Sequence, residues 1–220
     1  MGALVFFIIV IALHFTCLVK KWEVMKSVSK ALIIPSLFAL FLSVASSLSL
    51  VISNWHFITA ALFFYTIGDV FLEFRAKEIF FAGVLSFAFG HVAYIVYFLL
   101  SGFSFPLFVL YLGICYLLHK ALFESLVIDK KEKDWIKYAV YISFVSALAV
   151  AAGSASWNGI WIARIIALLG CISYAFSDSL VIYRMRKVDS SISNEVLIMM
   201  SYIAANALIL SSILLKSQAV

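Results

Sequence analysis

Long apolar runs, separated by short polar stretches, follow one another along the whole chain. A run of about 20 apolar residues is long enough to cross a bilayer as an α-helix. On this criterion the sequence predicts eight transmembrane helices, at 2–19, 31–52, 57–74, 79–100, 105–128, 136–152, 158–184 and 193–215. The connections are short, as in "SNWH", "RAKE" and "SGFS". We therefore expect an all-α, polytopic membrane protein whose residues 1–220 form a single helical-bundle domain with antiparallel neighbours.

The two prolines are both placed near the start of a predicted helix. Pro35 lies in the first turn or so of the second span, and Pro106 opens the fifth. Proline lacks the backbone N–H that a helix interior uses but that the first turn does not need. Both positions are therefore compatible with unbroken helices.

The composition agrees with a membrane protein. Hydrophobic residues make up 65% of the 220 residues and charged residues 12%, with a mean hydropathy of +1.14. A soluble domain carries roughly a quarter charged residues. The net charge of +5 could suggest nucleic acid, but excess Lys and Arg in a membrane protein sets orientation or contacts anionic lipid. We expect membrane lipids as partners and no nucleic acid, and the sequence leaves the oligomeric state open.

The basic residues gather in alternate connections. All but Arg164 and Lys216 of the 16 Lys and Arg residues fall at or near the first, third, fifth and seventh. They are Lys20, Lys21, Lys26, Lys30, Arg75, Lys77, Lys120, Lys130, Lys131, Lys133, Lys137, Arg184, Arg186 and Lys187. The positive-inside rule makes these connections cytoplasmic and places both termini on the non-cytoplasmic side. We expect a multi-pass protein of the cell membrane, the inner membrane if the organism is bacterial.

Two aspartates interrupt the apolar spans at equivalent positions, and intramembrane ionisable residues are functional candidates. Asp69 lies in "YTIGDVFLEFR" (65–75) and Asp178 in "YAFSDSLVIYR" (174–184), which share Tyr, Asp and Arg at the same spacing. The spacing from Asp to Arg predicts that each carboxyl lies about 9 Å from the cytoplasmic end of its helix. The stretches are about half the chain apart, which fits either two four-helix halves related as a parallel repeat or a chance likeness of short apolar segments.

Polar and aromatic side chains accompany these aspartates on the same and the following helices. They are Tyr65, Tyr174, His91, Tyr94, Tyr202 and Asn206. Helical spacing puts each preceding Tyr on the face of its Asp, and Gly83 and Gly90 let another helix approach closely. A purely structural role, in hydrogen bonds between helices, explains the presence of some of these residues. It explains two carboxyls at one depth poorly, because like charges repel unless one holds a proton. We therefore expect a polar pocket that both aspartates face.

Two carboxyls in one low-dielectric pocket titrate as a unit, so one can act as an acid while its partner acts as a base. That pair suits cleavage of a C–O bond through an oxocarbenium-like transition state. The chain has no Gly-x-Ser-x-Gly elbow, no His-Glu-x-x-His helix, no Gly-rich phosphate loop and no CxxC pair. We therefore expect neither a metal nor an organic cofactor. A zinc site built from His91 and the two aspartates is the alternative.

Four sequence blocks carry a resemblance that covers most of the chain. They are "SKALIIPSL" (29–37), "IGDVFLEF" with "FFAGVLSFAFGHVAYIVYF" (80–98), "LGCISYAFSDSLVIY" (169–183) and "SYIAANALI" (201–209). In their order and spacing they resemble the YhhN-like integral membrane proteins, the lysoplasmalogenase family. One position departs from the family pattern: Asn206 stands where Tyr-x-x-Ala-Gln has glutamine.

The resemblance implies hydrolysis of the vinyl ether bond of lysoplasmalogen, giving a fatty aldehyde and glycerophosphoethanolamine or glycerophosphocholine. On this hypothesis Asp69 and Asp178 are the catalytic acid and base, in an order that the sequence does not decide. The polar residues around them orient water or tune the pair. Lys30 is the candidate for the substrate phosphate, with Arg75 or Arg184 behind it. The active site then lies nearer the cytoplasmic leaflet, from which a lysophospholipid enters.

Two other classes of protein fit part of the pattern. Paired intramembrane acids and an internal duplication also describe a proton-coupled small-molecule transporter. The expected depth of the aspartates, away from the bilayer midplane, argues against it. A non-catalytic lipid-binding membrane protein would keep the pocket without the chemistry.

Overall fold

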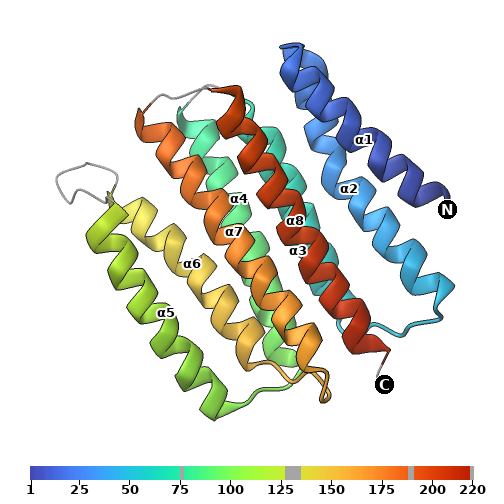
Figure 1. The fold of residues 1–220 in the computed structure, drawn as a ribbon, viewed down its shortest axis with the longest axis vertical. Coiled ribbons are helices and arrows are strands. Elements are labelled where there is room, and N and C mark those ends of the chain that lie inside the picture. Colours follow the sequence, from blue (N-terminus) through green and yellow to red (C-terminus); the bar gives the residue numbers. More distant parts are fainter. Residues whose placement is uncertain (75–76, 127–134, 188–190, 219–220) are drawn as a thin grey trace.

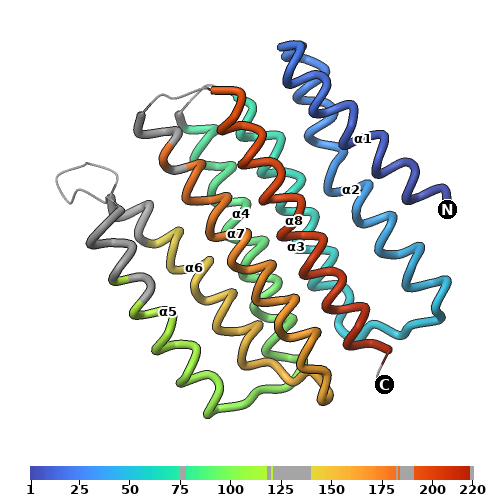
Figure 2. Tube along the Cα trace, viewed as in Figure 1, coloured from blue at the N-terminus to red at the C-terminus, as the bar shows by residue number. Residues whose placement is uncertain are grey.

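The computed structural model describes the backbone of residues 1–74, 77–126, 135–187 and 191–218 (Figure 2). Within these ranges the side chains of 77, 118–119, 121–126, 135–139, 182 and 184–187 are not described. The described ranges hold eight helices and no strand. They are α1 (Gly2–Val19), α2 (Glu23–Ser47), α3 (Trp55–Leu72), α4 (Lys77–Leu100), α5 (Phe105–Leu126), α6 (Trp135–Ser154), α7 (Trp161–Lys187) and α8 (Ile192–Ser217). The all-α prediction is confirmed.

Six of the eight helices are long and apolar enough to cross a membrane: α1, α2, α3, α4, α7 and α8. Within the described residues, α5 and α6 contribute shorter apolar helices, Phe105–Leu117 and Val140–Ser154. The chain is thus an integral, multi-pass membrane protein by the length and composition of its helices.

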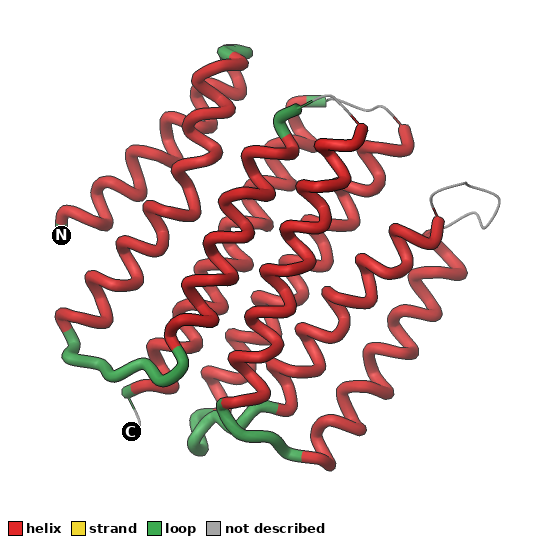
Figure 3. Tube along the Cα trace, turned by 180° about the vertical axis from the view of Figure 1, so that it is seen from behind, coloured by secondary structure: helices red, strands yellow, loops and turns green. Residues whose placement is uncertain are grey.

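The helices run up and down beside one another, so that neighbours in sequence are antiparallel (Figures 1 and 3). Helices α1 and α2 form a pair at one edge of the bundle, α5 and α6 form the opposite edge, and α3, α4, α7 and α8 lie between them (Figure 1). Helix α2 packs against α3 and α8, while α6 packs against both α4 and α7. The central four helices therefore hold most of the buried side chains.

One end of the bundle collects the connections that the sequence marks as basic. In Figure 1 the turn between α1 and α2 and the facing ends of α3, α4, α7 and α8 lie toward the top, and the facing ends of α5 and α6 lie at the upper left. The N-terminus and the C-terminus lie at the opposite ends of α1 and α8. This arrangement agrees with the predicted topology. Which end faces the cytoplasm, and the relation of two four-helix halves, stay predictions.

Helix α2 starts eight residues earlier than the apolar pattern predicts, at Glu23. An acidic residue in the first turn interacts favourably with the helix dipole, and Glu23 also pairs with Lys26, 2.8 Å away. Pro35 consequently lies inside the helix. The prediction that Pro35 occupies the first turn is therefore wrong. The first two turns of α2 contain charged residues, so a search for long apolar segments does not detect them.

The ends of α3 and α7 at the basic end of the bundle also differ from the prediction. Helix α3 ends at Leu72, three residues beyond Asp69, whereas α7 continues to Lys187, nine residues beyond Asp178. At 1.5 Å per residue the two aspartates lie about 4.5 Å and about 13.5 Å from their helix ends. The expectation of about 9 Å for both is wrong, because neither described helix ends at its arginine.

Glycines such as Gly90 and Gly170 allow close contacts between the central four helices. A Cβ on Gly90 of α4 would collide with the ring of Tyr65 of α3. A Cβ on Gly170 of α7 would lie 2.8 Å from Ile209 and 3.0 Å from the carbonyl oxygen of Ala205, both on α8. Close packing at Gly90 is as the sequence predicts, and it brings the polar side chains of α3 and α4 together.

Candidate functional site

Asp69 and Asp178 both lie in the interior of the helix bundle, with 2% and 9% of their surfaces exposed. Asp69 is on α3 and Asp178 is on α7, two helices that run in the same direction. An ionisable side chain enclosed by apolar helices is stable only with partners or when neutral. Their partners therefore decide what each carboxyl can do.

The partner of Asp69 comes from the last helix. The hydroxyl of Tyr202 on α8 donates a hydrogen bond of 2.9 Å to Oδ2 of Asp69. Lys30 and Glu73 also lie close enough to Asp69 to interact with its charge. Asp69 thus lies between an aromatic donor on one side and a charged cluster on the other.

Asp178 instead faces a histidine. Nε2 of His91 on α4 lies 3.5 Å from Oδ2 of Asp178. Among the described residues neither atom has a hydrogen-bond partner, and their separation is longer than that of a typical hydrogen bond. The other ring nitrogen, Nδ1, lies 2.7 Å from the hydroxyl of Tyr65. His91 therefore connects Tyr65 of α3 to Asp178 of α7.

Three tyrosine rings pack against one another next to the partners of the two aspartates. The ring centroid of Tyr65 lies 5.4 Å from that of Tyr174 and 6.4 Å from that of Tyr202, and the last two are 6.1 Å apart. The Tyr65 ring is thus the common neighbour of the Asp69 partner and of the Asp178 partner. The structure brings both aspartates to one aromatic cluster.

Asn206, the residue that departs from the family pattern, is fully buried and keeps hydrogen bonds at both ends of its amide. Its Oδ1 accepts a short hydrogen bond from the Tyr174 hydroxyl, and its Nδ2 donates to the carbonyl oxygen of Tyr202 at 3.0 Å. Tyr202 and Asn206 lie one turn apart on α8, as the sequence spacing predicts. The shorter amide therefore reaches α7.

Tyr94 lies about one helical turn from His91 on α4 and is fully buried. Its ring centroid is 5.8 Å from that of Tyr65, and its hydroxyl is buried without a hydrogen-bond partner among the described side chains. The structure thus places Tyr94 beside the cluster but not in contact with either aspartate.

Tyr141 of α6 belongs to the site although the sequence did not single it out. Its ring centroid lies 6.1 Å from that of His91, and its side chain also interacts with the Asp178 carboxyl. One tyrosine in an apolar helix carries no signal of this role in the sequence. Only the packing of α6 against α4 and α7 reveals it.

Lys30, the predicted phosphate ligand, lies at the basic end of the bundle and is paired with an acid. Its Nζ donates to Oε1 of Glu73 at 2.9 Å, and Ser27 donates to Oε2 of Glu73 at the same distance. Glu73 is four residues beyond Asp69, a spacing that could have indicated a shared face. Arg75 and Arg184, the predicted secondary cations, lie outside the described side chains.

Glu73 caps the end of α3, outside the span, and its carboxyl is held in the charged form. Burial acts to raise its pKa, but the charge of Lys30 and the hydrogen bonds from Lys30 and Ser27 outweigh burial and lower the pKa below its usual value. Glu73 therefore neutralises Lys30 at neutral pH. A phosphate that binds Lys30 must share it with Glu73.

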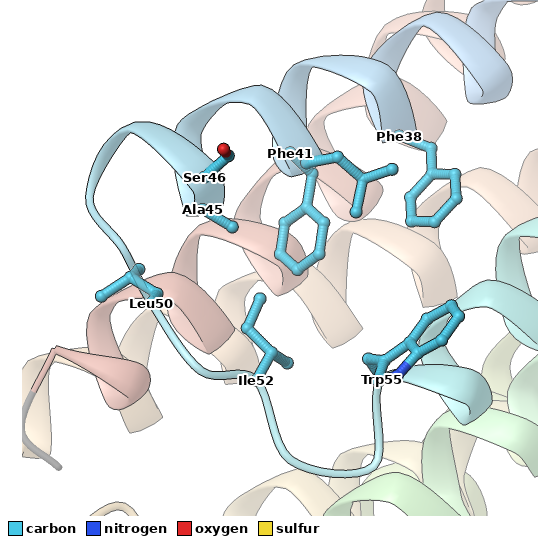
Figure 4. Close-up of a pocket in the computed structure, with 8 residues that line it drawn as sticks. Phe38, Phe41, Ala45, Ser46, Leu50, Ile52 and Trp55 are labelled. Atoms are coloured by element: carbon cyan, nitrogen blue, oxygen red, sulfur yellow. The ribbon is translucent and has the colours of Figure 1, made fainter.

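Two pockets in the structure lie away from the aspartates. One of about 270 Å³ lies where α2 ends and α3 begins, between Phe41, Ile52 and Trp55 (Figure 4). The other, of about 370 Å³, lies between α4, α5 and α6 and includes Leu99 and Cys115. Both are lined mainly by apolar side chains. A cavity shared by Asp69 and Asp178 stays a prediction.

The zinc alternative requires His91 and both aspartates to converge. Among the described residues no group of three His, Cys, Asp or Glu side chains is placed to hold a metal ion. His91 is close to Asp178, whereas Asp69 turns to Tyr202. The three donors therefore do not form a single ligand set.

Comparison with known proteins gives one match. A model of the YhhN family matches residues 25–213, from the first turn of α2 to near the end of α8. No curated protein and no solved structure matches the chain. The matched range contains every site residue described above.

Proposed function

Because the chain belongs to the YhhN family, we propose that it is a membrane hydrolase of the lysoplasmalogenase type. Its substrate is a lysophospholipid whose single chain is joined by a vinyl ether bond. The products are a fatty aldehyde and glycerophosphoethanolamine or glycerophosphocholine. The catalytic residues are Asp69 and Asp178.

The observation that carries the proposal is the unlike surroundings of the two buried carboxyls. Asp69 accepts a hydrogen bond from the neutral donor Tyr202, while Asp178 faces the imidazole of His91. Carboxyls in different environments separate into an acid and a base at neutral pH. Vinyl ether hydrolysis requires both functions in one site.

The reaction begins with transfer of a proton from the neutral carboxyl to the β-carbon of the vinyl ether. This leaves an oxocarbenium ion at the α-carbon, whose positive charge the ionised carboxylate stabilises. Water, deprotonated by that carboxylate, adds its oxygen to the α-carbon and forms a hemiacetal. The second carboxyl, now protonated, gives its proton to the glycerol oxygen as the hemiacetal C–O bond breaks, while the first carboxylate takes the proton of the hemiacetal hydroxyl. The glycerol part leaves as the alcohol and the aldehyde is released. The sum consumes one water and regenerates both carboxyls.

The residues around the aspartates position this chemistry. Tyr202 holds the carboxyl of Asp69 in one orientation, and Tyr65 fixes the ring of His91 against Asp178. Asn206 holds Tyr174 in the same cluster. Rigid neighbours of this kind reduce the motion that a proton donor must lose in the transition state. The three tyrosines, His91 and Asn206 act as positioning residues.

The substrate enters from the leaflet at the basic end of the bundle. Lys30 of α2 is the ligand for its phosphate, close to Asp69. Its hydrocarbon chain then extends along the apolar helices toward the other end. We place this end in the cytoplasmic leaflet of the cell membrane, the inner membrane in a bacterium.

An assay of the purified protein in detergent tests the proposal. With a lysoplasmalogen and an aldehyde-reactive probe, we expect aldehyde release that depends on protein concentration. Turnover without a sealed membrane excludes obligate transport, and it also excludes a role in lipid binding alone. No release from ethanolamine or choline lysoplasmalogen would overturn the proposed reaction.

Conservative changes of the two carboxyls identify the catalytic residues. Asp69→Asn and Asp178→Asn each remove one acid or base and keep the volume, so we expect kcat to fall about 100- to 10,000-fold. Glu78→Gln, at an exposed glutamate that begins α4, is the matched control. Retained activity in a folded aspartate variant contradicts the mechanism.

A further inference from the structure

A group of charged side chains from three helices meets at the basic end of the bundle. Nζ of Lys26 on α2 lies 2.8 Å from Glu23 on the same helix, 3.9 Å from Glu195 on α8 and 4.0 Å from Glu73 at the end of α3. We call Lys26, Lys30, Ser27, Glu73 and Glu195 the head-group cluster.

The head-group cluster is well enclosed for charged groups near a membrane surface. The side chains of Lys26 and Lys30 are 14% and 12% exposed, and those of Glu73 and Glu195 are 20% and 17% exposed. Charges removed this far from water require partners. A ligand that separates these ion pairs must therefore replace both the cation and the anion that it displaces.

The head-group cluster lies one helical turn from Asp69. Glu73 follows Asp69 by four residues, a rise of about 6 Å along the helix. Lys30 and Glu73 both interact with the Asp69 charge. In a lysophospholipid, the short glycerol unit that separates the phosphate from the ether oxygen spans a similar length. A phosphate at the lysines therefore places the ether bond beside Asp69.

We propose that the head-group cluster binds the substrate head group as a zwitterion and prefers phosphoethanolamine to phosphocholine and to a bare phosphate. The proposal rests on the proposed function and adds the head group that the site selects. Lys26 and Lys30 bind the phosphate, while Glu73 and Glu195 bind the ammonium.

Charge pairing selects the zwitterion over a bare phosphate. When the phosphate takes Lys26 and Lys30, the carboxylates that these lysines neutralised lose a cation. An ammonium on the same head group replaces that cation, so every charge keeps a partner. A phosphate monoester brings none and leaves the enclosed Glu73 without the cations that neutralised it, which is costly.

Hydrogen bonding selects ethanolamine over choline. The head-group cluster already holds a primary ammonium, that of Lys26, with three carboxylates within 4.0 Å. The ethanolamine ammonium has three N–H donors for such acceptors, as a lysine ammonium has. The trimethylammonium of choline has none, and proteins recognise it with aromatic cages instead. Carboxylates without such donors bind choline through charge alone.

Head-group selectivity tests the proposal directly. We compare kcat/KM for alkenyl lysophospholipids that carry phosphoethanolamine, phosphocholine or a phosphate monoester. The wild type should prefer ethanolamine by roughly tenfold or more, the equivalent of one charge-assisted hydrogen bond. Glu195→Gln removes one of the two ammonium ligands and should reduce this preference several-fold. Equal kcat/KM values for the three substrates in the wild type overturn the proposal.

Two further variants guard against a merely structural effect. Lys26→Gln removes a phosphate ligand and should raise KM for all three substrates. Glu78→Gln changes an exposed glutamate outside the head-group cluster and should leave the selectivity as in the wild type. A loss of selectivity in Glu78→Gln equal to that in Glu195→Gln would contradict the assignment.

A binding measurement separates this proposal from the proposed function. Saturated 1-O-alkyl lysophospholipids with the same three head groups bind but cannot be hydrolysed at a vinyl ether. If they show the ethanolamine preference and its loss in Glu195→Gln, the head-group site stands even without any aldehyde release. If aldehyde is released but neither binding nor kcat/KM depends on the head group, this inference fails and the hydrolase stands.

Discussion

The hydroxyl of Tyr202 donates a 2.9 Å hydrogen bond to Asp69, a residue 133 positions earlier in the chain. The bond joins α8 to α3, two helices that are far apart in sequence. A tyrosine that is fully enclosed with a carboxyl has little freedom to find another partner. This pair therefore fixes the orientation of one of the two proposed catalytic groups.

Removal of the Tyr202 hydroxyl should impair catalysis more than substrate binding. Tyr202→Phe leaves the Asp69 carboxyl without its donor, and loss of a hydrogen bond to a charged or buried group costs about 1–3 kcal/mol. We expect kcat to fall by about tenfold or more with a smaller change in KM. Steady-state kinetics on lysoplasmalogen measures both. Tyr116→Phe, at an exposed tyrosine of α5, is the control and should behave as the wild type.

Tyr65 and His91 should act as a unit. Their side chains are joined by a 2.7 Å contact, so Tyr65→Phe and His91→Gln remove the same interaction from opposite ends. A double-mutant cycle on kcat/KM should give a coupling energy of about 0.5–3 kcal/mol. His91→Gln combined with Tyr116→Phe should instead be additive. An additive Tyr65–His91 cycle would show that the contact does not serve catalysis.

A methyl group on Gly90 should disturb the site through Tyr65. Gly90→Ala places a Cβ against the Tyr65 ring, which must move away from His91. We expect loss of activity and a lower thermal midpoint, since overpacking costs about 1–3 kcal/mol. Gly113→Ala is a matched control, because no heavy atom lies within 4 Å of the added Cβ. It should be neutral or slightly stabilising, by up to about 1 kcal/mol.

Glu73 should make the stability of the basic end depend on pH. The pKa of Glu73 is lowered from 4.5 in the folded protein, chiefly by Lys30 against the opposing effect of burial. The contribution of Glu73 to the stability of the folded protein is therefore complete above its unfolded-state pKa of 4.5. This contribution is lost as the pH falls through the lower pKa of Glu73 in the folded protein. The difference in thermal midpoint between the wild type and Glu73→Gln should be largest near neutral pH. It should shrink below pH 4.5; a difference that grows there has the wrong sign.

The helical architecture could be predicted because each apolar run is long and ends in polar residues. The first helix has the same bounds in the structure as in the prediction, Gly2–Val19. Helix α2 was predicted too short, since its first eight residues include Glu23, Lys26 and Lys30 and so fail a test for apolar windows. The two lysines are stabilised by Glu73 at the end of α3 and by Glu195 on α8. A hydropathy pattern contains no information on such partners.

The members of the candidate site could be predicted, but their pairing could not. Helical spacing correctly puts Tyr202 and Asn206 on one face of α8. It cannot say that this face meets Asp69 on α3 and Tyr174 on α7, because that depends on the order in which the helices pack. For the same reason the sequence did not indicate Tyr141, which reaches Asp178 from α6.

Two side-chain hydrogen bonds join α8 to both of the helices that carry the aspartates. Tyr202 binds Asp69 of α3, and Asn206, one turn away, binds Tyr174 of α7. A slide of α8 along its axis would strain both contacts together, so neither aspartate can lose its alignment alone. The separation of the two acids is therefore set by a third helix. A displacement of α8 would therefore disturb the surroundings of both aspartates through one helix.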